Sequence, residues 1–104
     1  MKRGEIWWAG LPRPVGRRPV LLLSRDSAYA VRASITVAPV TRTIYQIPVE
    51  VPLGVEDGLP KPCVVNLDGI VTIPKRLLVK NLTTLSATKM ALVDVAIRFA
   101  LDLG

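Results

Sequence analysis

An arginine and a threonine flank two apolar segments of the chain, where both could contact one phosphate. Arg18 directly precedes the apolar segment Pro19–Ser24, and Thr41 follows shortly after the segment Ile35–Pro39. A guanidinium donates hydrogen bonds to the non-bridging phosphate oxygens, on which negative charge grows when a phosphodiester is cleaved. A hydroxyl can hold the scissile phosphate, or a ribose 2′-OH, in line for attack. Because the 2′-OH is itself the nucleophile, this pair suffices in principle for RNA cleavage. Threonine is also common at strand ends for structural reasons alone.

The positive charge of the chain is confined to its first part. The net charge is +6, and residues 1–43 carry eight basic side chains against two acidic ones, so the rest of the chain is neutral. Most of these basic residues are arginines, which suit bidentate contact with phosphate. A polyanion is therefore the expected partner, although a basic surface kept for solubility is the alternative. The predicted RNA-binding basic residues are Arg13, Arg17, Arg25 and Arg42.

Composition excludes several classes of enzyme. The chain has no histidine and one cysteine, so no Cys/His metal cluster, no Ser–His or Cys–His nucleophile pair and no imidazole base can form. We therefore expect neither a metal nor any other cofactor. The single Cys63 lies in an apolar stretch and is expected to be a small core residue. No apolar stretch approaches the length of a membrane-spanning helix, so a cytoplasmic protein without membrane contact is expected.

The spacing of apolar and turn residues predicts one mainly β domain covering residues 1–104. Nine prolines and seven glycines mostly separate short segments rich in β-branched residues, which is typical of a small β domain. A helical turn is expected within Thr72–Leu77. The predicted strands are Glu5–Ala9, Pro19–Ser24, Ile35–Pro39, Val49–Leu53, Cys63–Leu67, Ile70–Ile73 and Val79–Leu85.

A C-terminal helix of about four turns is predicted from Ser86 onward, with Ser86 as its N-cap. Apolar residues recur at helical spacing but also occupy other faces of this helix, and only a narrow polar stripe is left. A single small sheet cannot cover so much apolar surface. We therefore expect a second copy of the chain to cover the remainder in a homodimer, with covering loops as the alternative.

Five aromatic side chains are available for stacking on RNA bases. Strand alternation predicts that one of the two adjacent tryptophans is buried and the other exposed, without indicating which. The loop Pro12–Arg17 is expected to close over one end of a groove. The five aromatic residues are Trp7, Trp8, Tyr29, Tyr45 and Phe99.

Four stretches of the chain, together with its C-terminal helix, resemble the MazF/PemK toxins of bacterial toxin–antitoxin systems. The stretches are Lys2–Ala9, Arg18–Ser24, Val37–Thr41 and Val64–Ile73, which follow one another as the first, second, third and late strands of that family do. The resemblance implies a mainly β fold with appended helices, namely an SH3-like small barrel of the MazF, PemK and CcdB type with a C-terminal α-helix.

The resemblance also implies a function and site residues. It implies a homodimeric, metal-independent endoribonuclease that cleaves single-stranded RNA at a short sequence and is neutralised by an acidic, MazE-like antitoxin. Arg18 and Thr41 match the family's catalytic pair. A PemK-like branch uses a late-strand carboxylate as the base, and Asp68 stands there, but its companion arginine is Asn66 in this chain. Gly69 replaces a larger polar residue found in many members, so the recognised RNA sequence does not transfer.

Two other functions remain open from the sequence. A non-catalytic SH3-like nucleic-acid-binding module would show the same basic first part, with Arg18 as one phosphate contact among several. A toxin of the same fold that inhibits a gyrase subunit is the second alternative, because a fold does not determine a function.

Overall fold

Seven antiparallel strands form one continuous sheet in the computed structural model, which describes residues 1–104. The strands are β1 (Glu5–Gly10), β2 (Arg17–Leu22), β3 (Ser34–Thr41), β4 (Glu50–Leu53), β5 (Cys63–Asn66), β6 (Val71–Pro74) and β7 (Leu78–Thr84). Two α-helices, α1 (Ala28–Val31) and α2 (Ala87–Ala100), and three short 3₁₀ turns, η1 (Val55–Asp57), η2 (Leu67–Gly69) and η3 (Lys75–Leu77), complete the chain.

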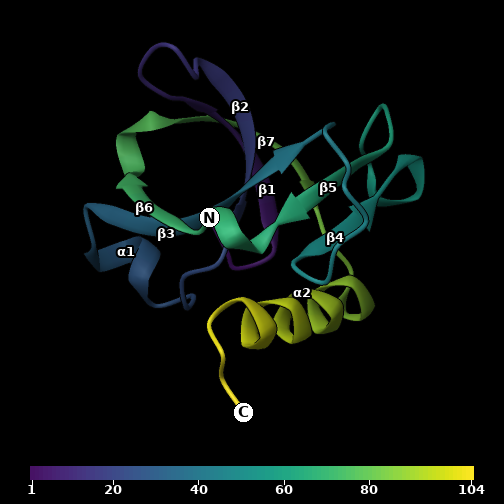
Figure 1. Cartoon of the computed structure of the whole chain (residues 1–104). Helices are drawn as coiled ribbons and strands as arrows, with labels where there is room; N and C mark the ends of the chain where they lie inside the picture. The colour runs from purple at the N-terminus through teal and green to yellow at the C-terminus, as the bar shows by residue number, and fades with distance from the viewer.

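The sheet curls back on itself as a small barrel (Figure 1). Its strand order is β4-β5-β3-β2-β1-β7, and β6 also pairs with β3. Because only η3 separates β6 from β7, the strands β6 and β7 join the β3 side of the barrel to the β1 side. The mainly β fold with appended helices and a C-terminal helix is confirmed. The hairpin between β1 and β2 projects at one end of the molecule, and α2 lies at the other.

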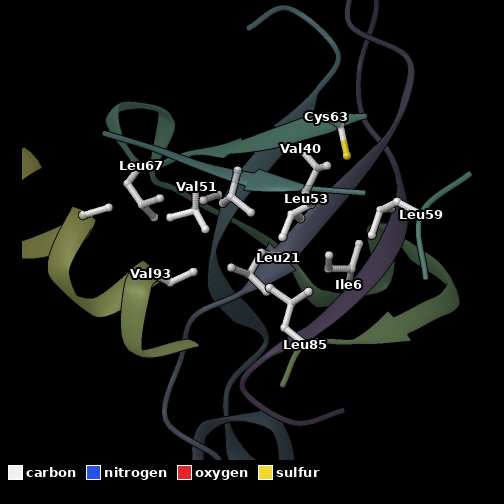
Figure 2. Close-up of a cluster of buried hydrophobic side chains, with 13 residues drawn as sticks. Ile6, Leu21, Val40, Val51, Leu53, Leu59, Cys63, Leu67, Leu85 and Val93 are labelled. Atoms are coloured by element: carbon white, nitrogen blue, oxygen red, sulfur yellow. The ribbon is translucent and has the colours of Figure 1, made fainter. Parts of the chain in front are cut away.

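The central strands are buried on both faces, which explains their unbroken apolar sequences. Successive side chains of a strand point to opposite faces. Accordingly, Leu21 of β2 belongs to the larger core cluster (Figure 2), whereas its neighbours Val20 and Leu22 belong to a second cluster on the other face. Helix α2 contributes Val93 and Ala96 to the larger cluster, so the helix closes one side of that core.

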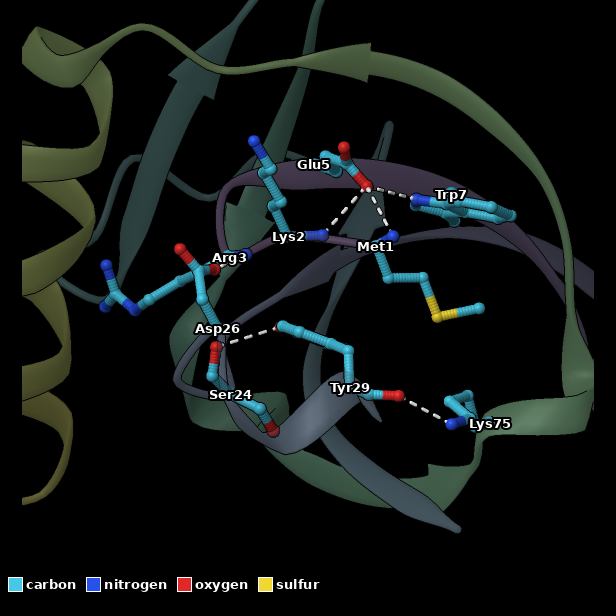
Figure 3. Close-up of polar contacts among 9 residues, drawn as sticks. All are labelled: Met1, Lys2, Arg3, Glu5, Trp7, Ser24, Asp26, Tyr29 and Lys75. Carbon is cyan, nitrogen blue, oxygen red and sulfur yellow. Dashed lines mark hydrogen bonds and ion pairs between the residues drawn. The ribbon is translucent and has the colours of Figure 1, made fainter. Parts of the chain in front are cut away.

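Polar contacts fix the N-terminal segment and α1 against the barrel (Figure 3). Glu5 Oε1 accepts hydrogen bonds from the Lys2 amide at 3.0 Å and from Trp7 Nε1 at 2.9 Å. The Tyr29 hydroxyl donates to the Ser24 carbonyl at 2.9 Å, and Lys75 Nζ donates to the Tyr29 carbonyl at 2.6 Å. Burial raises the pKa of Tyr29 to about 12, so its phenol stays protonated as this donor even at a pH where an ordinary tyrosine ionises.

Helix α1 was not predicted, because its four residues carry no local helix signal. Its N-cap residue Ser27 makes no side-chain capping bond, and the helix has no charged residue placed to offset its dipole. The helix is held from outside by the contacts of Tyr29 just described, and burial of Ala28 and Tyr29 adds to them. Such tertiary support leaves no trace in local sequence.

The prediction that one tryptophan is buried and the other exposed is wrong, since Trp7 and Trp8 are both half-buried. Trp7 packs against the second core cluster, whereas Trp8 faces a surface pocket on the opposite side of β1. Register irregularities in the β1–β7 pairing fall on either side of this pair. Each tryptophan therefore meets a partly covered face, and neither face is fully buried or fully open.

The helix predicted from Ser86 is confirmed as α2, and the Ser86 hydroxyl accepts the Lys89 amide at 3.1 Å. The inner side of α2 packs on the core, but no loop covers its outer side. The exposed apolar residues there and just beyond the helix are Leu92, Val95, Phe99, Leu101 and Leu103. No helix of the structure is long and apolar enough to cross a membrane.

Candidate active site

A pocket of about 660 Å³ opens where β1, β2 and β3 approach the connection between β4 and β5. Its floor includes three residues of the larger core cluster, Val40, Leu59 and Cys63, so the pocket lies directly over apolar packing. We call it the cationic pocket. Its remaining lining residues are Trp8, Val15, Arg17, Arg18, Pro19, Thr41, Arg42, Thr43, Pro60, Lys61 and Leu82.

Strand register accounts for the presence of Arg18 and Thr41 in the same pocket. Strand β2 pairs with β3 from Val20 opposite Pro39 onward, and the same register carried two residues further places Arg18 opposite Thr41. Opposite residues of an antiparallel pair point to the same face. The pairing of β2 with β3 ends at Val20, because the preceding residue Pro19 has no N–H to donate. The two strands thus end their pairing where the pocket begins.

A backbone amide two residues along the chain orients the Thr41 side chain. The Thr43 amide donates to Thr41 Oγ1 at 3.1 Å, so this oxygen already accepts one hydrogen bond. A hydroxyl has one proton to donate in addition to its acceptor sites. The hydroxyl proton of Thr41 is therefore available to a ligand oxygen in the pocket, and the short turn fixes the position of the oxygen that carries it.

The electrostatics of the pocket are one-sided. Four cationic side chains line it, namely those of Arg17, Arg18, Arg42 and Lys61, and no carboxylate does. None of the four makes an ion pair within the chain. The Arg17 guanidinium lies over the Trp8 ring, 5.0 Å from its centroid, an arrangement that holds the charge without neutralising it. The pocket therefore suits an anion.

Cys63 lies in the floor of the pocket without being a reactive thiol. Its side chain is buried, and burial raises the pKa of the thiol, with the negative charge of Asp57 adding to the effect. A thiol held in its protonated form is a poor nucleophile. This environment agrees with the prediction that Cys63 is a core residue.

The other predicted site residues lie outside the cationic pocket. Arg13 lines a second, mostly apolar pocket of about 370 Å³, which shares Val15 with the first. Arg25 is exposed after β2 and lines neither pocket. Asp68 is also exposed in η2, where its amide donates to Asn66 Oδ1 at 2.9 Å, and it lines neither pocket. The structure thus brings together Arg17, Arg18, Thr41 and Arg42 of the predicted set.

Gly69 sits beside the second pocket with no room for a side chain. A Cβ at this position would lie 2.6 Å from Pro39 Cγ. Pro39 and Gly69 both line the second pocket. A larger residue at position 69 would therefore require Pro39 to move, and the glycine lets the turn at η2 approach β3 closely.

Sequence reasoning missed Lys61 and Thr43 as pocket residues. Lys61 lies between two prolines in the connection that leads to β5, within the part of the chain whose charges cancel overall. Its distance from Arg18 in sequence gave no hint that the two cations share a pocket. Thr43 enters because the turn that starts at Thr41 folds back along the pocket edge.

The structure contains no cluster of three or more His, Cys, Asp or Glu side chains that could hold a metal ion. The chemistry available in the cationic pocket is thus that of guanidinium, ammonium and hydroxyl donors directed at an anion.

Comparison with known proteins assigns this chain to a family. Residues 2–101 match the model of the PemK-like, MazF-like toxins of type II toxin–antitoxin systems. This chain belongs to the PemK/MazF toxin family. The probable endoribonuclease MazF5 of Mycobacterium tuberculosis is 38% identical over 101 residues, covering 96% of this chain and 92% of the relative. The resemblance noted from the four stretches is therefore confirmed.

Solved structures of PemK/MazF toxins share the fold over nearly the whole chain. The Mycobacterium tuberculosis toxin MazF-mt6 superposes with a TM-score of 0.89 at 35% identity, covering 96% of this chain and 98% of that one. A mycobacterial endoribonuclease in complex with its cognate antitoxin superposes with a TM-score of 0.88 at 27% identity, covering 100% of this chain and 97% of that one. This PemK/MazF-like chain thus has the fold of a solved MazF toxin and of an endoribonuclease solved in complex with its antitoxin.

Proposed function

We propose that this single-domain protein is an endoribonuclease toxin that cleaves single-stranded RNA at a short sequence, without a metal ion. The observation that carries the proposal is the convergence of Arg18 and Thr41 on one pocket that contains four cations and no carboxylate. Membership of the PemK/MazF family and the similarity to relatives named endoribonucleases support it. Messenger RNA is the proposed substrate, which would place the protein in the cytoplasm.

The proposed reaction is a transesterification within the RNA. The ribose 2′-oxygen attacks the adjacent phosphorus, the bond from phosphorus to the 5′-oxygen breaks, and a 2′,3′-cyclic phosphate and a 5′-hydroxyl end form. The 2′-OH loses its proton and the leaving 5′-oxygen gains one, so the step consumes no other reactant. Because the nucleophile belongs to the substrate, the protein has to align it and to stabilise the charge of the phosphorane.

Each catalytic residue has a role that its surroundings permit. Arg18 is exposed and unpaired, so its guanidinium can donate to the two non-bridging oxygens on which charge develops. The Thr41 hydroxyl, whose oxygen accepts the Thr43 amide, donates its proton to a phosphate oxygen and fixes the phosphate for in-line attack. Arg17, Arg42 and Lys61 hold neighbouring phosphates.

Three further residues are proposed as RNA contacts away from the scissile phosphate. Arg13 lines the second pocket and Asp68 precedes Gly69, which also lines it, so both lie where a strand leaving the cationic pocket past Val15 would pass. Arg25, exposed after β2, is proposed to contact the RNA backbone further along. If the strand runs past Asp68, this carboxylate would be the only one of the set able to accept a proton.

An acidic antitoxin segment is the proposed inhibitor. Similar toxins have been crystallised as MazE–MazF complexes from Deinococcus radiodurans. A peptide with carboxylates would match the four unpaired cations of the pocket and exclude RNA from it by direct competition. The exposed outer side of α2 is proposed to pair with a second copy of the chain, because its apolar residues have no cover within one chain.

The test is to incubate the pure protein with a long single-stranded RNA in EDTA and to map the new ends. The expected result is discrete fragments with 2′,3′-cyclic phosphate ends, together with no cleavage of a substrate that carries a 2′-deoxy ribose at the cut site. Cleavage of that deoxy substrate would rule out transesterification. Retarded but intact RNA would identify a binding module, and growth arrest that persists in Arg18→Ala and Thr41→Ala variants would favour a protein-targeting toxin.

A further inference from the structure

The loop between β3 and β4 starts at Thr41 and has a backbone that side chains hold at two places. At its first turn, the Thr43 amide donates to Thr41 Oγ1. Further along, the Tyr45 amide donates to Glu50 Oε1 at 3.0 Å, and the Gln46 amide donates to the same oxygen at 2.8 Å. Such anchoring is uncommon for an exposed connection, since loops are usually the more mobile parts of a domain.

The second anchor is a buried carboxylate. Glu50 is 8% exposed and is the only buried charged residue of the chain. Burial of a charged group is unfavourable unless hydrogen bonds replace its water. Here two consecutive backbone amides supply those bonds, and Gln46 adopts the left-handed backbone conformation (φ 57°) that directs its amide to the carboxylate. The shape of the loop at these two residues is therefore set by Glu50.

The anchored backbone presents apolar side chains to solvent. Tyr45 is 67% exposed, and its neighbours Ile44 and Ile47 are 43% and 41% exposed. Of the five aromatic residues, Tyr29 is buried, Trp7 is bonded to Glu5, and Trp8 lies under Arg17. Phe99 is exposed on α2, which lines neither pocket. Tyr45 is thus the one exposed aromatic side chain next to the cationic pocket.

The position of Tyr45 relative to the cationic pocket indicates its partner. Thr43 lines the pocket, and two residues of chain span at most about 7 Å. Tyr45 is therefore close enough to the four cations to meet a base next to a phosphate that they hold. Every base has a π-face that stacks on an aromatic ring, and proteins that bind single strands combine such rings with a cationic groove.

We propose that Tyr45 stacks on a nucleobase of the single-stranded RNA next to the scissile phosphate, and that Glu50 is a positioning residue that holds Tyr45 there. The proposal rests on the proposed RNA substrate and adds a base contact outside the cationic pocket. The aromatic ring supplies the contact, and the buried carboxylate keeps the loop from losing order when RNA is absent.

Binding to a short single-stranded RNA, measured by fluorescence anisotropy, tests the role of Tyr45. The RNA carries the mapped cut site with a 2′-deoxy ribose at the cut. If no cleavage is found, the proposed catalytic function has failed, and an unmodified mixed-sequence RNA serves for binding. Tyr45→Leu is expected to weaken binding between about 5-fold and about 150-fold, the range for loss of one base stack. Tyr45→Phe keeps the ring and most of the affinity, and Val31→Ala, an exposed residue elsewhere, changes nothing.

An abasic nucleotide placed at each position around the cut identifies the stacked base. At one position, the abasic RNA should bind the wild-type protein more weakly than the intact RNA does. The Tyr45→Leu variant should bind the two RNAs equally, because both changes remove the same contact. The proposal is overturned if Tyr45→Leu binds RNA as the wild type does, or if the abasic penalty is the same in both proteins. A change in sedimentation with unchanged RNA affinity would instead assign Tyr45 to a protein interface.

Hydrogen exchange in the wild-type protein tests the positioning role of Glu50 without any variant. The amides of Tyr45 and Gln46 should exchange more slowly than those of Ile44 and Ile47, which make no such bond. Glu50→Gln keeps an oxygen that can accept both amides, so it should retain RNA affinity that Glu50→Ala loses. Fast exchange at all four amides, or equal affinity of both folded variants, would refute the role.

Discussion

The two ends of this barrel use charged residues in opposite ways. At the α2 end, Arg3 Nη2 lies 2.7 Å from Asp94 Oδ1, and Lys89 Nζ lies 3.4 Å from Asp57 Oδ2. At the other end, the four cations of the cationic pocket face no carboxylate. The paired cations tie the chain together, since Arg3 joins the N-terminal segment to α2 and Lys89 joins α2 to η1. The unpaired cations make no ion pair within the chain and remain free for a ligand.

Apolar surface differs between the two ends in a similar way. The cationic pocket lies over core residues, and its four cations are exposed and open to a ligand. The outer side of α2 exposes apolar residues without any cationic cluster. The first surface suits an anion and the second suits another apolar surface. Substitutions at the pocket end should therefore change activity, and those at the α2 end should change stability or association.

The largest effect is expected from Arg18→Ala. Removal of one donor from a transition-state oxyanion lowers kcat by about 10²–10³. Because Arg18 is exposed and makes no ion pair, the thermal unfolding midpoint should stay near that of the wild type. Single-turnover cleavage of RNA, with thermal unfolding followed in parallel, measures both. Arg18→Lys keeps the charge without the planar fork and should recover part of the rate; full activity of Arg18→Ala would remove the basis of the mechanism.

Thr41→Val should have the next largest effect. The substitution removes a hydroxyl donor to a charged phosphate oxygen, which corresponds to about 1.5–3 kcal/mol and hence to roughly a 10-fold to 150-fold slower reaction. Thr41→Ser keeps the hydroxyl and should keep most of the rate. The comparison of the two variants in kcat is the measurement. A loss in Thr41→Ser with full activity in Thr41→Val would point to packing of the Thr41 methyl group instead.

A smaller effect, on the salt dependence of RNA binding, also distinguishes the two ends. Each phosphate contact to a single strand contributes about −0.7 to the slope of log K against log salt concentration. Arg42→Gln and Lys61→Gln should each reduce the slope by about that amount. Arg98→Gln, on α2 and outside both pockets, is the matched control and should leave the slope unchanged. Equal effects of all three changes would mean that binding responds to net charge and not to the pocket.

The smallest effect is expected at the α2 end. Arg3→Gln removes a partly exposed ion pair with Asp94, and such pairs contribute about 0.2–1 kcal/mol to stability. Loss of the bond from Arg3 Nε to the Leu23 carbonyl adds to this effect. Urea unfolding should show the decrease, whereas the cleavage rate per folded molecule should not change. A slower cleavage rate at equal folded fraction would contradict the separation of the two ends.

Much of the fold was predictable because local patterns carry it. The strands follow from β-branched segments between turn residues, and α2 follows from Ser86 and helical spacing. Helix α1 was not predictable, since the contacts of Tyr29 that hold it join the Ser24 carbonyl outside the helix and the distant Lys75. The burial of Trp7 and Trp8 was predicted wrongly, because alternation gives the face of a side chain and not how completely that face is covered.

The candidate site was predictable in part. Arg18 and Thr41 were identified by their positions beside apolar strands and by the family resemblance, and Arg17 and Arg42 are their chain neighbours. Lys61 could not be found in this way, because it reaches the pocket through the connection between β4 and β5. Glu50 also gave no signal, since a glutamate in a sequence does not reveal whether backbone amides will surround it.

By itself, the sequence determined the family, the succession of strands, the C-terminal helix and the confinement of net positive charge to residues 1–43. These features depend on residues that are neighbours along the chain, so the types of those residues are enough to predict them. Only the tertiary structure decided that Lys61 joins Arg18 in one pocket, that Asp68 lies outside it and that Glu50 fixes the loop under Tyr45. The physical reason is that pairing of β2, β3 and β5 brings together residues that are distant in sequence, and a single sequence does not state their register.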